Sequence, residues 1–225
     1  GLIMLRIIQI IFVILPLCLS AQVDSSKYFI GGTLGIGYSS RILTTTESEL
    51  ELIEKSYNEL EEPTVSFRTG LRGGIKIGEN SIVSAGVLFS QNGYRIDTLE
   101  IASIHNVSFR YKSLEIPVMY QYTFIKNKSL KPYLSAGVAS SFIINSSMHY
   151  MRINELEKYK ENASDGVNKL QFGALVGAGI SKRFYEKYTF LIESLYHHNF
   201  TSIHDGLLER KLTNVSVNFG IVYHL

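Results

Sequence analysis

Histidine, hydroxyl and carboxylate side chains gather in one short stretch, YHHNFTSIHDG at positions 196–206, which holds three of the six histidines of the chain. A histidine that activates a hydroxyl while a carboxylate orients it is the arrangement used for nucleophilic hydrolysis. Here His197 or His198, with Ser202 and Glu193, offers those residue types. The first hypothesis from these residues is therefore hydrolysis of an acyl bond.

The same stretch offers imidazole and carboxylate groups, between His197 and Asp205, to a metal ion. No spacing within it is diagnostic of a metal site. A hydrated, polar strand end explains these residues without any chemistry, and we favour that interpretation. We therefore assign neither a catalytic residue nor a cofactor nor a metal from the sequence.

A second set of functional groups is cationic: Arg68, Arg72 and Lys76 recur every four residues in VSFRTGLRGGIKIG, positions 65–78. In a helix this spacing would place all three on one face. The four glycines of the segment argue against a helix, because each costs about 1 kcal/mol in a helix interior. A period of two instead separates the segment into an apolar face and a cationic face, which predicts a strand.

Seven further segments show the same alternation, at residues 28–38, 82–92, 113–124, 132–144, 170–184, 188–198 and 214–225. Pro117 interrupts one of them, and we expect a bulge or a local break there because proline cannot donate to the ladder. Glu115 and Glu193 share the polar face with the three cations. They are the candidate partners of Arg68, Arg72 and Lys76.

The connections between these segments alternate strictly between short and long. Strands of about 9 to 11 residues, apolar outside and polar inside, with short turns at one end and long loops at the other, are typical of outer-membrane barrels. We therefore predict an all-β fold, an eight-stranded antiparallel transmembrane β-barrel built as an up-and-down meander. A barrel of about eight strands is filled by its own side chains, so we expect an ion-paired polar plug and no open pore.

The N-terminus has the pattern of a cleaved signal peptide over residues 1–21, in which Arg6 precedes an apolar run that ends in Ser20 and Ala21. This division leaves residues 22–225 as the barrel domain. The only cysteine, Cys18, falls in the removed segment, so we expect no disulfide. A net charge of +2, from 22 basic and 20 acidic residues, gives no basic footprint for nucleic acid.

The segments SLEIPVMYQY, KPYLSAGVASS and LQFGALVGAGISKRF, together with the LSAQ ending of the signal segment, resemble the PorT-like outer-membrane β-barrel proteins of the Bacteroidetes. The resemblance covers residues 22–225. It implies a small barrel in the outer membrane and raises a role in type IX secretion, in which the named member of that family is implicated. The chain departs from the common pattern of outer-membrane proteins by ending on Leu225 rather than phenylalanine.

The histidine stretch also invites comparison with barrel-type lipid A deacylases, which use a histidine, a serine and a carboxylate at the membrane rim. Asn199 and Phe200 stand where the serine of their His-x-Ser-Asn pattern would be. A rim-active lipid A hydrolase therefore remains an alternative, as does a narrow channel for small solutes. The favoured function is a non-catalytic structural, adhesive or secretion-associated barrel.

Two polar segments are expected as extracellular loops, residues 39–63 and 152–167, and each is a candidate surface for a protein partner. The first contains an acidic stretch, Glu47–Pro63, whose apolar residues have helical spacing. A solvated acidic loop is the simpler interpretation. Outer-membrane lipid and lipopolysaccharide are the other expected partners, with divalent cations bridging the acidic stretch to the latter.

Overall fold

Nine β-strands make up most of the computed structural model, which describes residues 27–45, 60–99, 104–125, 129–152, 158–185, 187–204 and 209–225. The strands are β1 (Tyr28–Thr44), β2 (Glu61–Lys76), β3 (Ser81–Leu99), β4 (Ile104–Thr123), β5 (Leu130–Arg152), β6 (Lys158–Asn162), β7 (Leu170–Phe184), β8 (Tyr188–Asn199) and β9 (Glu209–His224). No described helix is long and apolar enough to cross a bilayer. The predicted signal peptide, residues 1–21, lies outside the described residues, as does most of the acidic stretch.

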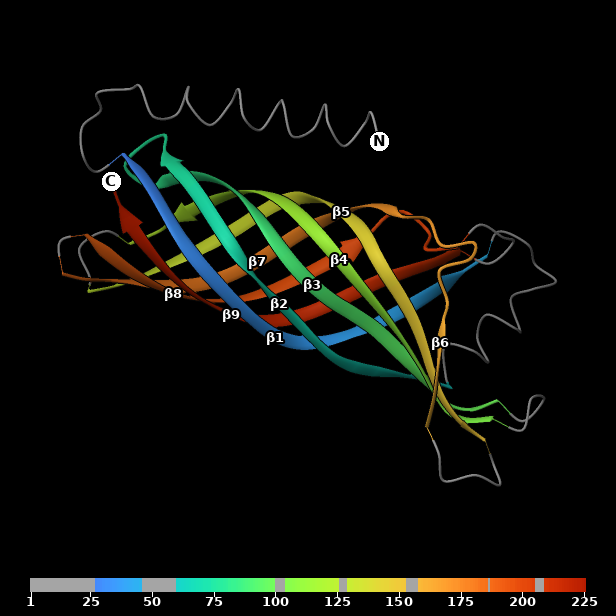
Figure 1. Cartoon of the computed structure of the whole chain (residues 1–225). Coiled ribbons are helices and arrows are strands. Elements are labelled where there is room, and N and C mark those ends of the chain that lie inside the picture. Colours follow the sequence, from blue (N-terminus) through green and yellow to red (C-terminus); the bar gives the residue numbers. More distant parts are fainter. Residues whose placement is uncertain are drawn as a thin grey trace.

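Eight of the strands close into a ring (Figure 1). All neighbouring pairs are antiparallel and follow chain order, and β1 pairs with β9, for example through Gly35 and Asn218, to complete the circle. The predicted eight-stranded up-and-down barrel is therefore confirmed. The remaining strand, β6, lies outside the ring. It pairs only with residues Ser147 to Met151 near the end of β5.

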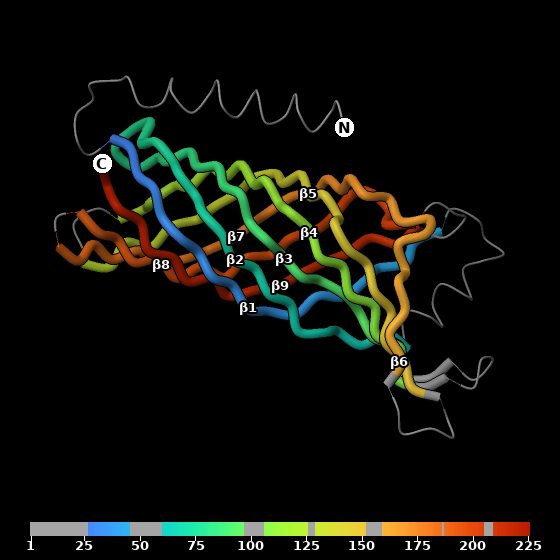
Figure 2. Tube along the Cα trace, in the orientation of Figure 1, coloured from blue at the N-terminus to red at the C-terminus, as the bar shows by residue number. Residues whose placement is uncertain are grey.

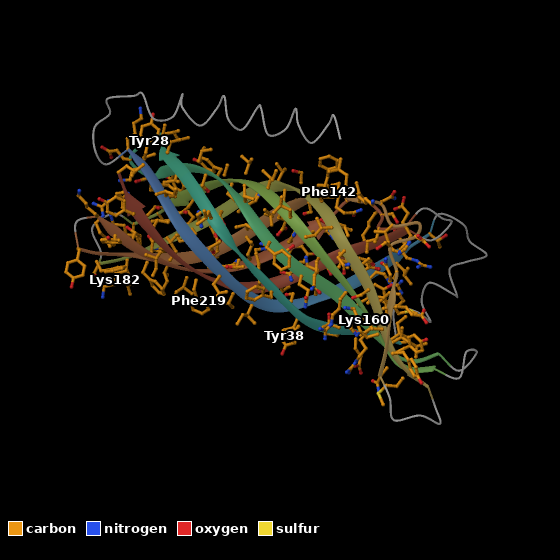
Figure 3. The ribbon with its side chains drawn as sticks, in the orientation of Figure 1. Tyr28, Tyr38, Phe142, Lys160, Lys182 and Phe219 are labelled. Carbon is orange, nitrogen blue, oxygen red and sulfur yellow. The ribbon has the colours of Figure 1, made fainter. Side chains whose placement is uncertain are left out.

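The side chains divide between two faces as the alternation predicts. Val65 and Leu71 on β2 are each 64% exposed, whereas Arg68 between them is 6% exposed. Tyr38, Phe142 and Phe219, on three different strands, point away from the barrel wall in Figure 3. The outer surface is consequently largely apolar, and the charged and most other polar side chains of the membrane-spanning strands face inward, which suits a barrel surrounded by acyl chains.

The strands β2, β4 and β7 end, and β3, β5 and β8 begin, at the end of the barrel where Leu225 donates a backbone hydrogen bond to the Tyr28 carbonyl at 3.0 Å, so the short links belong to this end. Figure 2 shows the start of β1 beside the C-terminus at this end. Outer-membrane barrels keep their short turns on the periplasmic side. We therefore refer to this as the periplasmic end, and to the other as the extracellular end.

The eight strands of the ring are longer than the 9 to 11 residues expected from the sequence, and β5 reaches 23 residues. The predicted loop at 39–63 is wrong at both ends, because β1 continues to Thr44 and β2 begins at Glu61. The predicted loop at 152–167 contains β6. The long link between the segments at 82–92 and 113–124 is largely a hairpin, because β3 and β4 stay paired as far as Leu99↔Ile104. Backbone pairing continues outside the bilayer, where outward side chains need not be apolar and the alternation fades.

Pro117 produces a local break but no bulge. Its pairing with Ala139 of β5 stays in register, and on the β3 side the ladder lapses after Ala85↔Val118 and resumes in the same register at Leu88↔Glu115. The missing N–H of proline accounts for the lapse. The register shifts of β4 occur elsewhere, between His105 and Ser108 and between Lys112 and Ser113.

Candidate functional site

The centre of the barrel is occupied by a buried cluster of Arg68, Glu115 and His197, which come from three non-adjacent strands, β2, β4 and β8. Arg68 Nε lies 3.0 Å from Glu115 Oε2, and its Nη2 donates to Glu115 Oε1 at 3.0 Å. His197 Nδ1 is 3.1 Å from both Arg68 Nη2 and Glu115 Oε1. We call these residues the central cluster. Because its members reach inward from separate parts of the ring, it bridges the lumen.

Hydroxyl groups support the central cluster. Ser90 and Ser113, on β3 and β4, are buried and hydrogen-bond each other at 2.8 Å. Toward the extracellular side, Asn214 donates to Asn92 at 3.2 Å and also contacts Ser66 at 2.5 Å. These contacts tie β9 to β2 and β3 across the interior, which further narrows the passage.

The other sequence-predicted interior residues lie closer to the periplasmic end. Glu193 is 8% exposed and accepts a hydrogen bond from Ser135 at 2.6 Å. Arg72 donates to Ser84 at 3.3 Å. Arg72 and Glu193 line, together with Arg68, a cavity of only about 40 Å³. Among the described residues, neither Arg72 nor Lys76 forms an ion pair with a carboxylate.

Apolar layers alternate with these polar groups along the barrel axis. One layer, near the periplasmic end, consists of Phe29, Tyr133, Leu191 and Val222. Another, between it and the central cluster, consists of Ala139, Leu175 and Leu195, with Met119 packed against it. Water and ions would have to cross both layers, so the interior is sealed by packing as well as by charge.

The extracellular end of the interior is closed by a third apolar layer of Tyr94, Ile96, Tyr111, Ile143, Ile203 and Leu212. Ile203 comes from the β8–β9 connection and is 0% exposed. Arg41 forms an ion pair with Glu61 beside this layer, and its guanidinium lies 4.1 Å from the centre of the Tyr94 ring. The sequence does not single out the residues that close this end. Arg41 does, however, occupy one of the alternate positions of β1 that face inward.

The residue types of a hydrolase do not converge. His197 points into the lumen as part of the central cluster, while His198 is on the outer face, stacked with Tyr196 at a ring distance of 6.4 Å. Ser202 donates to the His204 carbonyl at 2.6 Å, and Glu193 binds Ser135. Asp205 lies outside the described residues. Among the described residues of this stretch, Ser202 is therefore not activated by His197 or His198.

No group of three or more histidine, cysteine or acidic side chains in the described ranges is arranged to hold a metal ion. His197 is instead held by the ion pair of Arg68 and Glu115. The alternation predicts a strand at His197 but does not predict which residues of other strands surround it.

A groove of about 740 Å³ runs along the outside of the extracellular half, over β1 to β5. Apolar residues Tyr38, Val65 and Phe67 form one part of it, and Arg95, Arg110 and His149 form the other. Burial lowers the pKa of His149 below its usual value near 6.5, and the charges of Arg110 and Lys160 lower it further. The groove is therefore amphipathic, with its cationic part beyond the lipid-facing band.

Residues 20–205 match the family described as "Outer membrane protein beta-barrel domain". The chain belongs to this family. Its members lie in the bacterial outer membrane, which agrees with the apolar outer face of this barrel. The predicted location in the bacterial outer membrane is thus confirmed, whereas the match does not reach the finer PorT-like group.

Solved structures agree with the family. The crystal structure of Neisserial surface protein A is similar with a TM-score of 0.50 and 13% identity, over 90% of this chain and 100% of that one. The outer membrane protein OprG of Pseudomonas aeruginosa has a TM-score of 0.50 and 12% identity, over 90% and 97%. At this identity the likeness concerns the fold alone. The comparison with curated proteins found no match.

Proposed function

We propose that this outer membrane β-barrel protein is a non-catalytic, non-conducting barrel that acts through its extracellular surface. The central cluster is the observation that carries the proposal. Arg68, Glu115 and His197 fill the lumen from three sides, and apolar layers lie on either side of them. A sealed interior leaves the outer faces for function.

Planar-bilayer recording tests this proposal. We expect the folded protein to give no steady conductance at any applied potential, while a general porin recorded under the same conditions conducts. A variant with Arg68→Ala and Glu115→Ala should stay closed as well, because the apolar layers around Leu191 and Ile203 remain. Steady, reproducible channels from the unmodified protein would refute the closed interior and favour the narrow solute channel.

The extracellular half is the favoured working surface. The β3–β4 hairpin and β5, with β6 beside it, extend beyond the closed ring (Figure 1). Residues 158–167 and the strand ends that flank residues 46–59 belong to the same side. We propose that a protein partner binds there, through the two segments at 39–63 and 152–167. Cysteines placed at Lys160 and at Lys182, on opposite ends of the barrel (Figure 3), would locate the partner by cross-linking. We expect cross-links from position 160 and none from position 182.

The amphipathic groove supports lipopolysaccharide as the lipid partner. Acyl chains would contact Val65 and Phe67, and phosphate groups would reach Arg110 and His149. Arginine pairs well with phosphate. We expect Arg110→Gln to weaken binding of purified lipopolysaccharide in detergent by about tenfold, the equivalent of one charge-assisted hydrogen bond, and the control Lys182→Gln to leave it unchanged. Equal binding by both variants would remove the groove from consideration.

A role in type IX secretion follows only from the PorT-like resemblance. Its test is whether deletion of the gene leaves secreted cargo in the periplasm. Normal secretion in the deletion strain would leave the closed barrel and its extracellular surface as the proposal.

A further inference from the structure

A cavity of about 120 Å³ opens at the periplasmic end of the barrel. Its cationic lining residues are Arg72, Lys76, Lys131 and Arg183. Glu79, in the β2–β3 turn, is the one carboxylate among the lining residues that the structure describes. We call this cavity the periplasmic vestibule.

The vestibule has an apolar floor. Phe29, Leu191 and Val222 line it and belong to the layer that seals the lumen from this side. The four cations form no ion pair with a carboxylate among the described residues. A cleft with low-dielectric walls and charges of one sign concentrates the electrostatic potential. The vestibule therefore combines a positive electrostatic potential with an apolar floor.

His224 supplies an independent sign of a ligand. Its side chain lines the vestibule and the residue is 7% exposed. Nε2 lies 2.9 Å from the Thr189 hydroxyl, whereas the buried Nδ1 has no hydrogen-bond partner among the described residues. If Thr189 donates to Nε2, the proton of a neutral imidazole is on Nδ1. A buried donor without a partner then lies close to the charges of Arg183 and Lys76.

We propose that the periplasmic vestibule binds a phosphate group. Four cations against one carboxylate favour an anion with more than one charge over a single carboxylate. Arginine and lysine are the usual protein ligands of phosphate, and they bind it with charge-assisted hydrogen bonds. Gln121 and Thr123 add neutral donors to the lining. The phosphate belongs either to a soluble periplasmic compound or to the headgroup of a neighbouring lipid.

Calorimetric titration of inorganic phosphate and pyrophosphate into the full-length protein, folded in a phosphate-free non-ionic detergent, tests the site. We expect saturable binding that weakens with added salt. Lys76→Gln and Arg183→Gln should each weaken it by at least about tenfold, since a hydrogen bond to a charged group contributes about 1.5–3 kcal/mol. Both variants are first checked for folding by heat-modifiable gel migration.

The matched control is Lys182→Gln. Lys182 precedes Arg183 on β7 but faces outward at the same end of the barrel (Figure 3), so phosphate affinity should not change. Absence of saturable binding to the unmodified protein, or equal weakening by Lys182→Gln, would overturn the proposal. A third titration uses dihexanoyl phosphatidic acid. Binding at least ten times tighter than that of phosphate assigns the site to a lipid headgroup, and equal binding assigns it to a soluble compound.

Discussion

Arg68 and Glu115 form a buried ion pair in the middle of the barrel, with Nε 3.0 Å from Oε2 and side-chain exposures of 7% and 1%. The exposed pair between Arg95 and Glu62 has side-chain exposures of 44% and 46%. The two pairs have the same chemistry in opposite surroundings. Removing one partner of the buried pair leaves an uncompensated charge, which is far more costly than the loss of a screened surface pair.

We expect Glu115→Leu to lower the free energy of unfolding by about 3–5 kcal/mol, because Arg68 would remain charged in the lumen. The control Glu62→Leu should cost about 0–1 kcal/mol. Urea unfolding in lipid vesicles, followed by circular dichroism because the chain has no tryptophan, measures both. The double variant Glu115→Leu with Arg68→Met should recover part of the lost free energy of unfolding. If the double variant is as unstable as Glu115→Leu alone, the buried charge of Arg68 is not the cause of the loss.

The face of the barrel wall on which each side chain lies could be predicted from the sequence, because the alternation of inward and outward positions along a strand is a local property. Arg68 and Glu115 follow the polar face of their strands, so their inward direction needed no knowledge of the fold. Which inward residues meet depends on the stagger of the strands around the ring. The alternation within each strand does not determine that stagger. From the sequence alone His197 is consequently a candidate for chemistry, whereas the ring brings it within 3.1 Å of Glu115.

The strand ends could not be predicted for a different reason. Inside the bilayer the outward residues are mostly apolar, with few exceptions such as Thr69 and Ser194, so the alternation is clear. Beyond it Arg95 and Arg110 face outward among polar neighbours, and the alternation fades although β3 and β4 stay paired as far as Leu99↔Ile104. The sequence therefore predicts the membrane-spanning part of the barrel and underestimates its extracellular part.

Glycine on the inner face gives the strands room to approach. A methyl group added to Gly31 would collide with the carbonyl oxygen of Ile221 and with Val222, whereas at outward-facing Gly32 the nearest atom is 3.9 Å away. We expect Gly31→Ala to destabilise the barrel by about 1–3 kcal/mol through overpacking. Gly32→Ala should be neutral or stabilising by up to about 1 kcal/mol. The same unfolding assay compares them, and an equal loss in both variants would refute the steric explanation.

The free-energy cost of a charged residue on the lipid-facing surface should depend on its depth in the bilayer. Val176 lies in the middle of β7 and is 58% exposed, whereas Leu170 is the first residue of that strand and is 52% exposed. We expect Val176→Arg to cost about 2–4 kcal/mol and Leu170→Arg about 0–1 kcal/mol, as for arginine at the midplane and near the interface of other barrels. Unfolding from phospholipid vesicles measures both. Similar costs at the two positions would argue against a bilayer around β7.

His149 should report the charge of the extracellular groove. Its pKa lies below 6.5 because of burial, Arg110 and Lys160, in that order. We expect Arg110→Gln to raise the pKa toward 6.5, and Lys187→Gln, at the periplasmic end, to leave it unchanged. Imidazole NMR shifts during a pH titration of the protein in micelles measure it. A pKa at or above 6.5 in the unmodified protein would contradict the arrangement.

The lowered pKa also sets the sign of a pH effect. The folded protein binds a proton at His149 less readily than the unfolded chain, so this residue contributes stability that is fully present above pH 6.5 and is lost as the pH falls through its folded pKa. Phosphate groups of lipopolysaccharide bound beside Arg110 would oppose the arginine and raise the pKa. We therefore expect added lipopolysaccharide to move the titration of His149 to higher pH and to reduce the acid sensitivity of the extracellular half. No movement on saturation would show that the lipid phosphates bind elsewhere.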